Sequence, residues 1–270
     1  MFRALENSLF IKDKKKYNEI REYALSFNSI YNGNNIIQDD IFHIVENYVR
    51  HQEMPFDFLR YPIKDEDLCA CTFMREGHMF VMVNSALPLS KQIFAAAHEL
   101  YHIYCYFEEK DTILMQSGSI LESDVMEDAA VETEDMEANA FAGLLLAPQD
   151  CLNEQTRIYG INYNNISMTD ILMLMEIFAI PYKAVILRLF EEEKITEKKV
   201  RELFLQDVND IEKYIQLTGR SARWQASPSN LIRFGGLMEE MNEAEQKEIV
   251  RTERLEDDKN RLQSIIEQLK

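Results

Sequence analysis

The sequence is poor in positive charge. Lys and Arg together number 29 against 47 Asp and Glu, which gives a formal net charge of −18. Binding a phosphate backbone requires a surplus of Lys and Arg on at least one face of a protein. We therefore expect no direct nucleic-acid binding by this chain.

Cysteine is also scarce, and its spacing predicts neither a metal cluster nor a disulfide framework. The four cysteines, Cys69, Cys71, Cys105 and Cys151, include no C-x-x-C pair. Charged and polar residues interrupt the apolar residues of the N-terminal segment, which therefore lacks the hydrophobic region of a signal peptide. No run is long and apolar enough to span a membrane. We expect reduced thiols in a cytoplasmic protein with no membrane partner.

Apolar residues, in contrast, are sufficient for a sizeable core, at 46% of 270 residues. Two short apolar runs, residues 69–73 and 79–83, flank Gly77 and predict a β-hairpin. Apolar residues between positions 37 and 48 recur at helical spacing. These patterns predict an α+β protein that is mostly helical and has a small antiparallel sheet.

Three longer stretches predict further helices. No Gly or Pro interrupts residues 91–117, which leaves room for a long helix. A second helical stretch runs from about residue 132 to residue 146 and is ended by Pro148. A third covers residues 169–193 and is broken near Pro181.

The character of the chain changes after Gly235 and Gly236. The following residues are highly charged, and their apolar members recur at the intervals of an amphipathic helix or helical hairpin. We therefore divide the chain into a core domain, residues 1–205, and a helical C-terminal extension, residues 206–270. No pattern indicates an oligomeric state.

The most informative string is H-E-x-x-H, formed by His98, Glu99 and His102 within the predicted long helix. A spacing of four places both imidazoles on one helix face, as two ligands of a tetrahedral zinc ion require. Glu99 directly follows His98 on the helix and can act as general base on a zinc-activated water. The alternative is a chance pair of histidines at the core edge. Apolar neighbours predict a buried helix, where two unsatisfied imidazoles would be costly, and so favour a metal.

A zinc site of this kind needs a third protein ligand. The second predicted helix offers four carboxylates, Glu132, Glu134, Asp135 and Glu137, before a run of small and apolar residues that contains Gly143. Gly inside a helix costs about 1 kcal/mol relative to Ala, so its presence suggests tight packing against a neighbour. Helical geometry alone does not choose among the carboxylates.

Residues 94–102 (FAAAHELYH) and 138–148 (ANAFAGLLLAP) together resemble the paired motifs of the ImmA/IrrE family of zinc metallopeptidases. The resemblance covers roughly residues 36–194. It implies a minimal zincin-like metallopeptidase core, Zn²⁺ as the cofactor and a cytoplasmic location. It also implies a short helix-turn-helix-like element near residues 169–193, and a role in cleaving or inactivating helix-turn-helix repressors.

The sequence departs from the family pattern at two positions. The residue before the second histidine is usually Gly in the family and is Tyr101 here. The third ligand of the family is a Glu, and the aligned residue is Asp135, whose side chain is one methylene shorter. The resemblance therefore favours Asp135 as the third metal ligand beside the two histidines, with Glu134 and Glu137 as alternatives.

Two functions fit these observations. The first is a zinc-dependent endopeptidase, with Glu99 as the catalytic base, that cleaves or inactivates a regulatory protein of the helix-turn-helix repressor type. The second is a catalytically weak, zincin-like binding module that sequesters a repressor or antitoxin. Tyr101 and Asp135 motivate the second function, because each departs from the family pattern.

Overall fold

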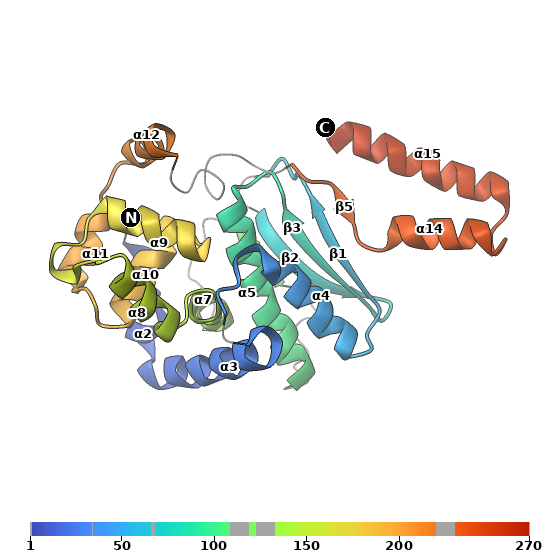
Figure 1. Ribbon diagram of the computed structural model, residues 1–270. Helices are drawn as coiled ribbons and strands as arrows, with labels where there is room; N and C mark the ends of the chain where they lie inside the picture. Colours follow the sequence, from blue (N-terminus) through green and yellow to red (C-terminus); the bar gives the residue numbers. More distant parts are fainter. Residues whose placement is uncertain are drawn as a thin grey trace.

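The computed structural model describes residues 2–33, 35–65, 68–108, 119–122, 133–219 and 230–269. A small sheet stands between the helical part of the molecule and the last two helices, which confirms the predicted fold class (Figure 1). The helices are α1 (Arg3–Glu6), α2 (Leu9–Lys12), α3 (Lys14–Asn32), α4 (Ile41–His51), α5 (Leu89–Glu108), α7 (Thr133–Leu146), α8 (Gln149–Ile158), α9 (Met168–Phe178), α10 (Tyr182–Glu191), α11 (Glu197–Phe204), α12 (Val208–Thr218), α14 (Leu237–Gln246) and α15 (Thr252–Leu269). Within the described ranges, none of these helices has the length and apolarity needed to cross a bilayer.

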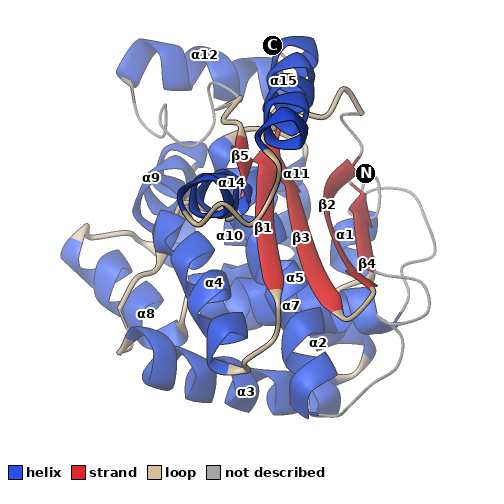
Figure 2. Cartoon of the chain, turned by 90° about the vertical axis from the view of Figure 1, so that its right-hand side faces the viewer, coloured by secondary structure: helices blue, strands red, loops and turns tan. Residues whose placement is uncertain are grey.

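The sheet has five strands in the order β4-β2-β3-β1-β5, seen face-on in Figure 2. The strands are β1 (Phe56–Tyr61), β2 (Leu68–Arg75), β3 (His78–Asn84), β4 (Ser119–Glu122) and β5 (Arg233–Phe234). The predicted hairpin is confirmed, since β2 and β3 pair antiparallel. Gly77 lies in the turn between them with a φ of +79°, a conformation that suits Gly.

One pairing differs from a purely antiparallel sheet, because β1 runs parallel to β3. The chain turns back after β1 and enters the sheet again as β2, two places away, so β3 fits between the two strands. The buried amide of Asn84 stabilises this connection. Its Oδ1 accepts hydrogen bonds from the backbone N–H groups of Ile63 and Ala86, both at 2.9 Å, and its Nδ2 donates to the carbonyl of Leu68 at 2.9 Å. The sheet is therefore mixed.

Helix α5 is the central element of the helical layer. It packs against β2, β3 and α4 on one side and against α7 on the other, and α3 crosses α7. Every residue of α5 from Gln92 to Ile103 is buried, because both sides of the helix are covered. The prediction of a long helix is confirmed as far as Glu108, and residues 109–117 lie outside the described ranges.

Helices α9 and α10 form the predicted helical stretch, with its break at the predicted place. Helix α9 ends at Phe178, its C-cap residue Ala179 has a φ of +55°, and α10 begins directly after Pro181. Both helices bury apolar side chains in the main core. This pair of helices thus packs as part of the protein interior.

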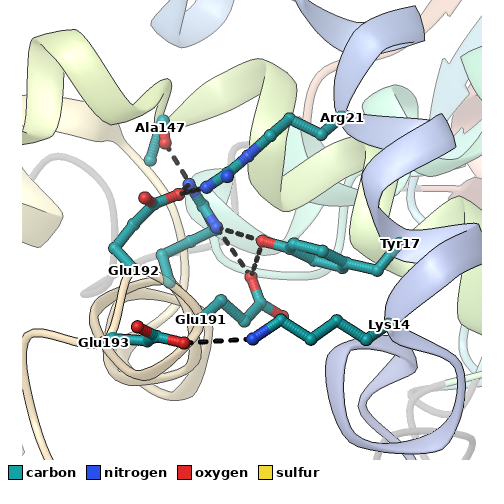
Figure 3. Close-up of polar contacts among 8 residues, drawn as sticks. Lys14, Tyr17, Arg21, Ala147, Glu191, Glu192 and Glu193 are labelled. Atoms are coloured by element: carbon teal, nitrogen blue, oxygen red, sulfur yellow. Dashed lines mark hydrogen bonds and ion pairs between the residues drawn. The ribbon is translucent and has the colours of Figure 1, made fainter.

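A buried ionic cluster joins α10 to α3 (Figure 3). The guanidinium of Arg188 is 1% exposed and donates to Tyr17 Oη at 2.8 Å, to Glu191 at 2.8 Å and to Glu192 at 2.5 Å. Arg21 of α3 also donates to Glu192. Two carboxylates and a hydroxyl therefore compensate one buried cation, which would otherwise be costly.

The predicted tight packing of Gly143 against a neighbour is confirmed, and the neighbour is Arg188. A Cβ added to Gly143 would lie 3.0 Å from Cδ of Arg188. A larger residue at this position of α7 would therefore have to displace the stem of Arg188.

The C-terminal segment contains the predicted helices and one unpredicted strand. Helices α14 and α15 pack on each other through a small separate cluster of Met241, Leu255 and Leu262. The strand β5 pairs antiparallel with β1. At its end, Oδ1 of Asp57 accepts a hydrogen bond from the backbone N–H of Gly236 at 3.1 Å. The segment is thus attached to the sheet edge by backbone contacts.

Candidate metal centre

The two histidines of the H-E-x-x-H string face the same point. Both lie on α5, and their Nε2 atoms are 3.2 Å apart. His98 is fully buried and His102 is 8% exposed, because α7 and the sheet enclose this part of the helix. The local spacing of four residues produces this convergence, since it is close to one helical turn.

A carboxylate from α7 completes the group. Oδ1 of Asp135 lies 3.7 Å from Nε2 of His98 and 3.7 Å from Nε2 of His102. In a tetrahedral site with bonds of about 2.0–2.1 Å, neighbouring ligand atoms are about 3.4 Å apart. The three atoms therefore form a triangle of the size that a zinc ion bound by two imidazoles and one carboxylate requires. Among the described residues, these three form a group that could hold a metal ion.

The protonation states of the group suit a metal. Burial, and then the proximity of His98, lower the pKa of His102 to about 3, against the opposing effect of Asp135. The imidazole is thus neutral near pH 7 and keeps a nitrogen lone pair for a ligand bond. Burial alone would raise the pKa of Asp135, but the hydrogen bond with His98 and the proximity of both histidines hold it below its usual range. A neutral imidazole and an ionised carboxylate are the ligand forms that zinc binds.

Asn139 orients the first histidine. Nδ1 of His98 lies 3.0 Å from Oδ1 of Asn139, an acceptor, so Nδ1 carries the ring proton. Nε2 then holds the lone pair and faces the other two members of the group. The sequence prediction missed this residue, although Asn139 follows Asp135 by four positions and so shares its face of α7.

Glu99 is fully buried on the same helix, one position after the first histidine. Its charge acts on β2, where burial raises the pKa of Cys71 to about 12 and the carboxylate of Glu99 adds to the rise. Glu99 therefore lies within electrostatic range of the strand that packs against α5, and it does not belong to the His-His-Asp group.

Glu134 and Glu137, the described carboxylates that were alternatives for the third position, are not members of this group. Oε2 of Glu137 accepts a hydrogen bond of 2.5 Å from the hydroxyl of Tyr101 and lies 3.4 Å from Nζ of Lys16. Glu134 is half-buried in the first turn of α7, and Glu132 lies outside the described residues. Of the carboxylates on α7, the geometry therefore favours Asp135.

Residues near the N-terminus also lie close to α7, in a pocket next to Asn139. The pocket at Asn139, whose Oδ1 contacts His98, is lined by Phe94 of α5, by Met136 and Asn139 of α7, and by Asn7 and Ser8 near the N-terminus. Residues of α1 and α2 also line this pocket, a contribution that the sequence did not predict.

Comparisons with known proteins agree with this geometry. A profile of the family described as the IrrE N-terminal-like domain, a peptidase family, matches residues 52–190, just over half of the chain. The matched range contains both histidines, Glu99 and Asp135. No curated protein matches the chain.

Proposed function

Because the chain belongs to the family of the IrrE N-terminal-like domain, which is of the metallopeptidase type, we propose that it is a zinc-dependent endopeptidase. The metal ligands would be His98, His102 and Asp135, and the general base would be Glu99. The observation that carries the proposal is the triangle of two Nε2 atoms and one carboxylate oxygen, with sides of 3.2, 3.7 and 3.7 Å.

The donor set supports zinc as the metal. Two imidazoles and one carboxylate are the ligands of many catalytic zinc sites, which keep a fourth position open for water or substrate. Hard cations such as Mg²⁺ and Ca²⁺ prefer oxygen ligands throughout. When bound, zinc would polarise the carbonyl of the scissile peptide and lower the pKa of a water molecule.

The residues of the chain then have separate tasks. Glu99 accepts the proton of the attacking water and delivers it to the amine nitrogen that leaves. Asn139 holds the ring of His98 in the tautomer whose Nε2 is a ligand. The enclosure of α5 limits the access of water to Glu99, which strengthens its electrostatic interactions.

A helix-turn-helix regulatory protein is the substrate class that we propose, on the strength of the family resemblance. The net charge of −18 supports a protein substrate over nucleic acid as the direct partner. A cytoplasmic location belongs to the same proposal, and it is supported by the four cysteines, which form no disulfide with one another.

The competing function is a binding module that holds a regulator without cleaving it. Asp135 motivated this alternative because its side chain is short. Its Oδ1 nevertheless lies as close to one histidine as to the other, at 3.7 Å, which favours a metal site that is adapted to Asp.

Metal analysis followed by a cleavage assay separates the two functions. We expect about one zinc per purified chain, and its loss in the double variant His98→Ala/His102→Ala. The wild-type protein should also cleave a helix-turn-helix regulator encoded beside its gene. Zinc without cleavage would favour the binding module, and full zinc in the double variant would refute the site assignment.

A further inference from the structure

The short side chain of Asp135 makes the distance between α5 and α7 critical. A carboxylate ligand must lie about 2.0–2.2 Å from zinc, and Asp provides one methylene less than Glu to cover that distance. The backbone of α7 must therefore lie closer to α5 at this point than a Glu ligand would require. Some contact between the two helices has to maintain this spacing.

A hydrogen bond joins the two helices at the same level. The hydroxyl of Tyr101 on α5 donates to Oε2 of Glu137 on α7, at 2.5 Å. Tyr101 is 3% exposed, and its ring lies 5.4 Å from the ring of Phe141, one turn further along α7. The contact combines a charge-assisted hydrogen bond with ring packing, so it resists separation of the helices.

Tyr101 and Glu137 are both close in sequence to proposed metal ligands. Tyr101 immediately precedes His102 in the sequence, and Glu137 follows Asp135 by two residues. The bond therefore fixes the two helical turns that carry a histidine ligand and the carboxylate ligand.

A third helix supports the acceptor. Nζ of Lys16 on α3 lies 3.4 Å from Oε2 of Glu137, whose side chain is only 12% exposed. The ammonium group of Lys16 thus lies beside a mostly buried carboxylate and holds Glu137 in place from the side of α3. Lys16 lies before the range that matches the family profile.

We propose that Tyr101 and Glu137 are positioning residues, whose hydrogen bond holds α7 close enough to α5 for Asp135 to bind the metal. This inference rests on the proposed zinc site. Tyr101 and Asp135, the two departures from the family pattern, then form one adaptation. The shorter side chain of Asp135 is compensated by a smaller distance between α5 and α7, which the hydroxyl of Tyr101 maintains.

Zinc affinity, measured by competition with a chromophoric chelator, tests the inference without an activity assay. Tyr101→Phe removes only the hydroxyl and should weaken zinc binding by about tenfold or more. Glu137→Ala should act similarly, whereas Glu137→Gln keeps an acceptor oxygen and should retain most of the affinity. Tyr106→Phe, the same change on the same helix at a half-buried tyrosine, is the matched control and should leave the affinity unchanged.

The decisive measurement is rescue by a longer ligand. In the wild-type background, Asp135→Glu should not tighten zinc, because the spacing suits Asp. In the Tyr101→Phe background the same change should restore affinity, because the extra methylene spans the wider gap. Circular dichroism and thermal unfolding of the metal-free proteins would establish that each variant is folded.

Each outcome bears on a separate conclusion. Equal zinc affinity in Tyr101→Phe and wild type would overturn the positioning role while leaving the metal site intact. A loss of affinity that Asp135→Glu does not restore would also overturn it, because the hydroxyl would then only stabilise the fold. A wild-type protein that binds no zinc would overturn the proposed function and this inference together.

Discussion

Nδ1 of His98 lies 3.0 Å from Oδ1 of Asn139, so a residue of α7 orients a histidine of α5. The relationship fixes which nitrogen of the imidazole bears the proton and therefore which nitrogen is available to a metal. In the proposed zinc site, part of the metal affinity would then depend on a residue that does not touch the metal.

Loss of the Asn139 amide should accordingly weaken the site. We expect Asn139→Ala to reduce zinc affinity by roughly 10-fold to 100-fold, because the ring of His98 loses its fixed tautomer and orientation. Chelator competition would measure the change. Asn139→Asp, which keeps an acceptor oxygen, should bind zinc better than Asn139→Ala, and equal affinities would show that the contact plays no orienting part.

Replacement of the proposed base should separate metal binding from chemistry. Glu99→Gln preserves size but cannot accept the proton of the attacking water, so zinc content should stay near wild type while cleavage falls about 10²-fold to 10⁴-fold. Metal analysis and a cleavage assay on the same preparation would show this. Near-normal turnover in the variant would exclude Glu99 as the base.

The close contact between Gly143 and Arg188 predicts a loss of stability on substitution. Gly143→Ala gains about 1 kcal/mol of helix propensity but places a Cβ 3.0 Å from a side chain held by several hydrogen bonds. Overpacking costs roughly 1–3 kcal/mol, so urea unfolding should show a net loss of up to about 2 kcal/mol. Gly236→Ala, whose Cβ meets only Glu240 at 3.9 Å, is the control. A more stable Gly143→Ala protein would contradict the prediction.

The buried ionic cluster predicts sensitivity to acid. Burial alone would raise the pKa of Glu192, but Arg188 and then Arg21 more than offset it and hold the pKa below its usual range. A carboxyl whose pKa is lower in the folded state stabilises the fold fully above the unfolded value of about 4.3, and this contribution is lost as the pH falls through the folded pKa.

The measurement compares wild type with Glu192→Gln, which cannot ionise. Urea unfolding should find the wild type clearly more stable at pH 6, and the difference should shrink as the pH is lowered below about 4.3. A difference that does not vary with pH would mean that the charge of Glu192 contributes nothing to folding.

Removal of α14 and α15 should leave the metal site unchanged. The segment after Gly236 contains no His or Cys, and its apolar residues pack mainly on one another. A chain that ends at Gly236 should bind zinc with wild-type affinity by chelator competition. Loss of zinc from such a protein, if circular dichroism shows it folded, would indicate a contribution from these helices.

The parts of the site that were predictable are those that local spacing determines. His98 and His102 lie on one helix, so the interval between them is enough to place both rings on one face. The choice of Asp135 as the third ligand came only from the family resemblance. The distance between Asp135 and the two histidines depends on how α7 packs against α5, which no local spacing determines. The Tyr101 hydrogen bond to Glu137 could not be predicted for the same reason, since no sequence interval relates two separate helices.

The fold shows the same division between local and long-range features. The hairpin of β2 and β3 is joined by a short turn and was predicted from the runs on either side of Gly77. Strand β5 is only two residues long, Arg233 and Phe234, and pairs with a strand more than 170 positions earlier in the sequence. So short a strand shows no alternation of apolar and polar residues, and only the pairing itself reveals it.

The attachment of β5 to β1 determines where the protein can be shortened. In the described sheet, β1 has β3 on one side and β5 on the other. A chain cut at residue 205, the predicted domain boundary, would lose β5 and leave the backbone of β1 open to pairing with another molecule. Such a protein should self-associate during expression, whereas one that ends at Gly236 keeps the hydrogen bond to Asp57 and a covered sheet edge.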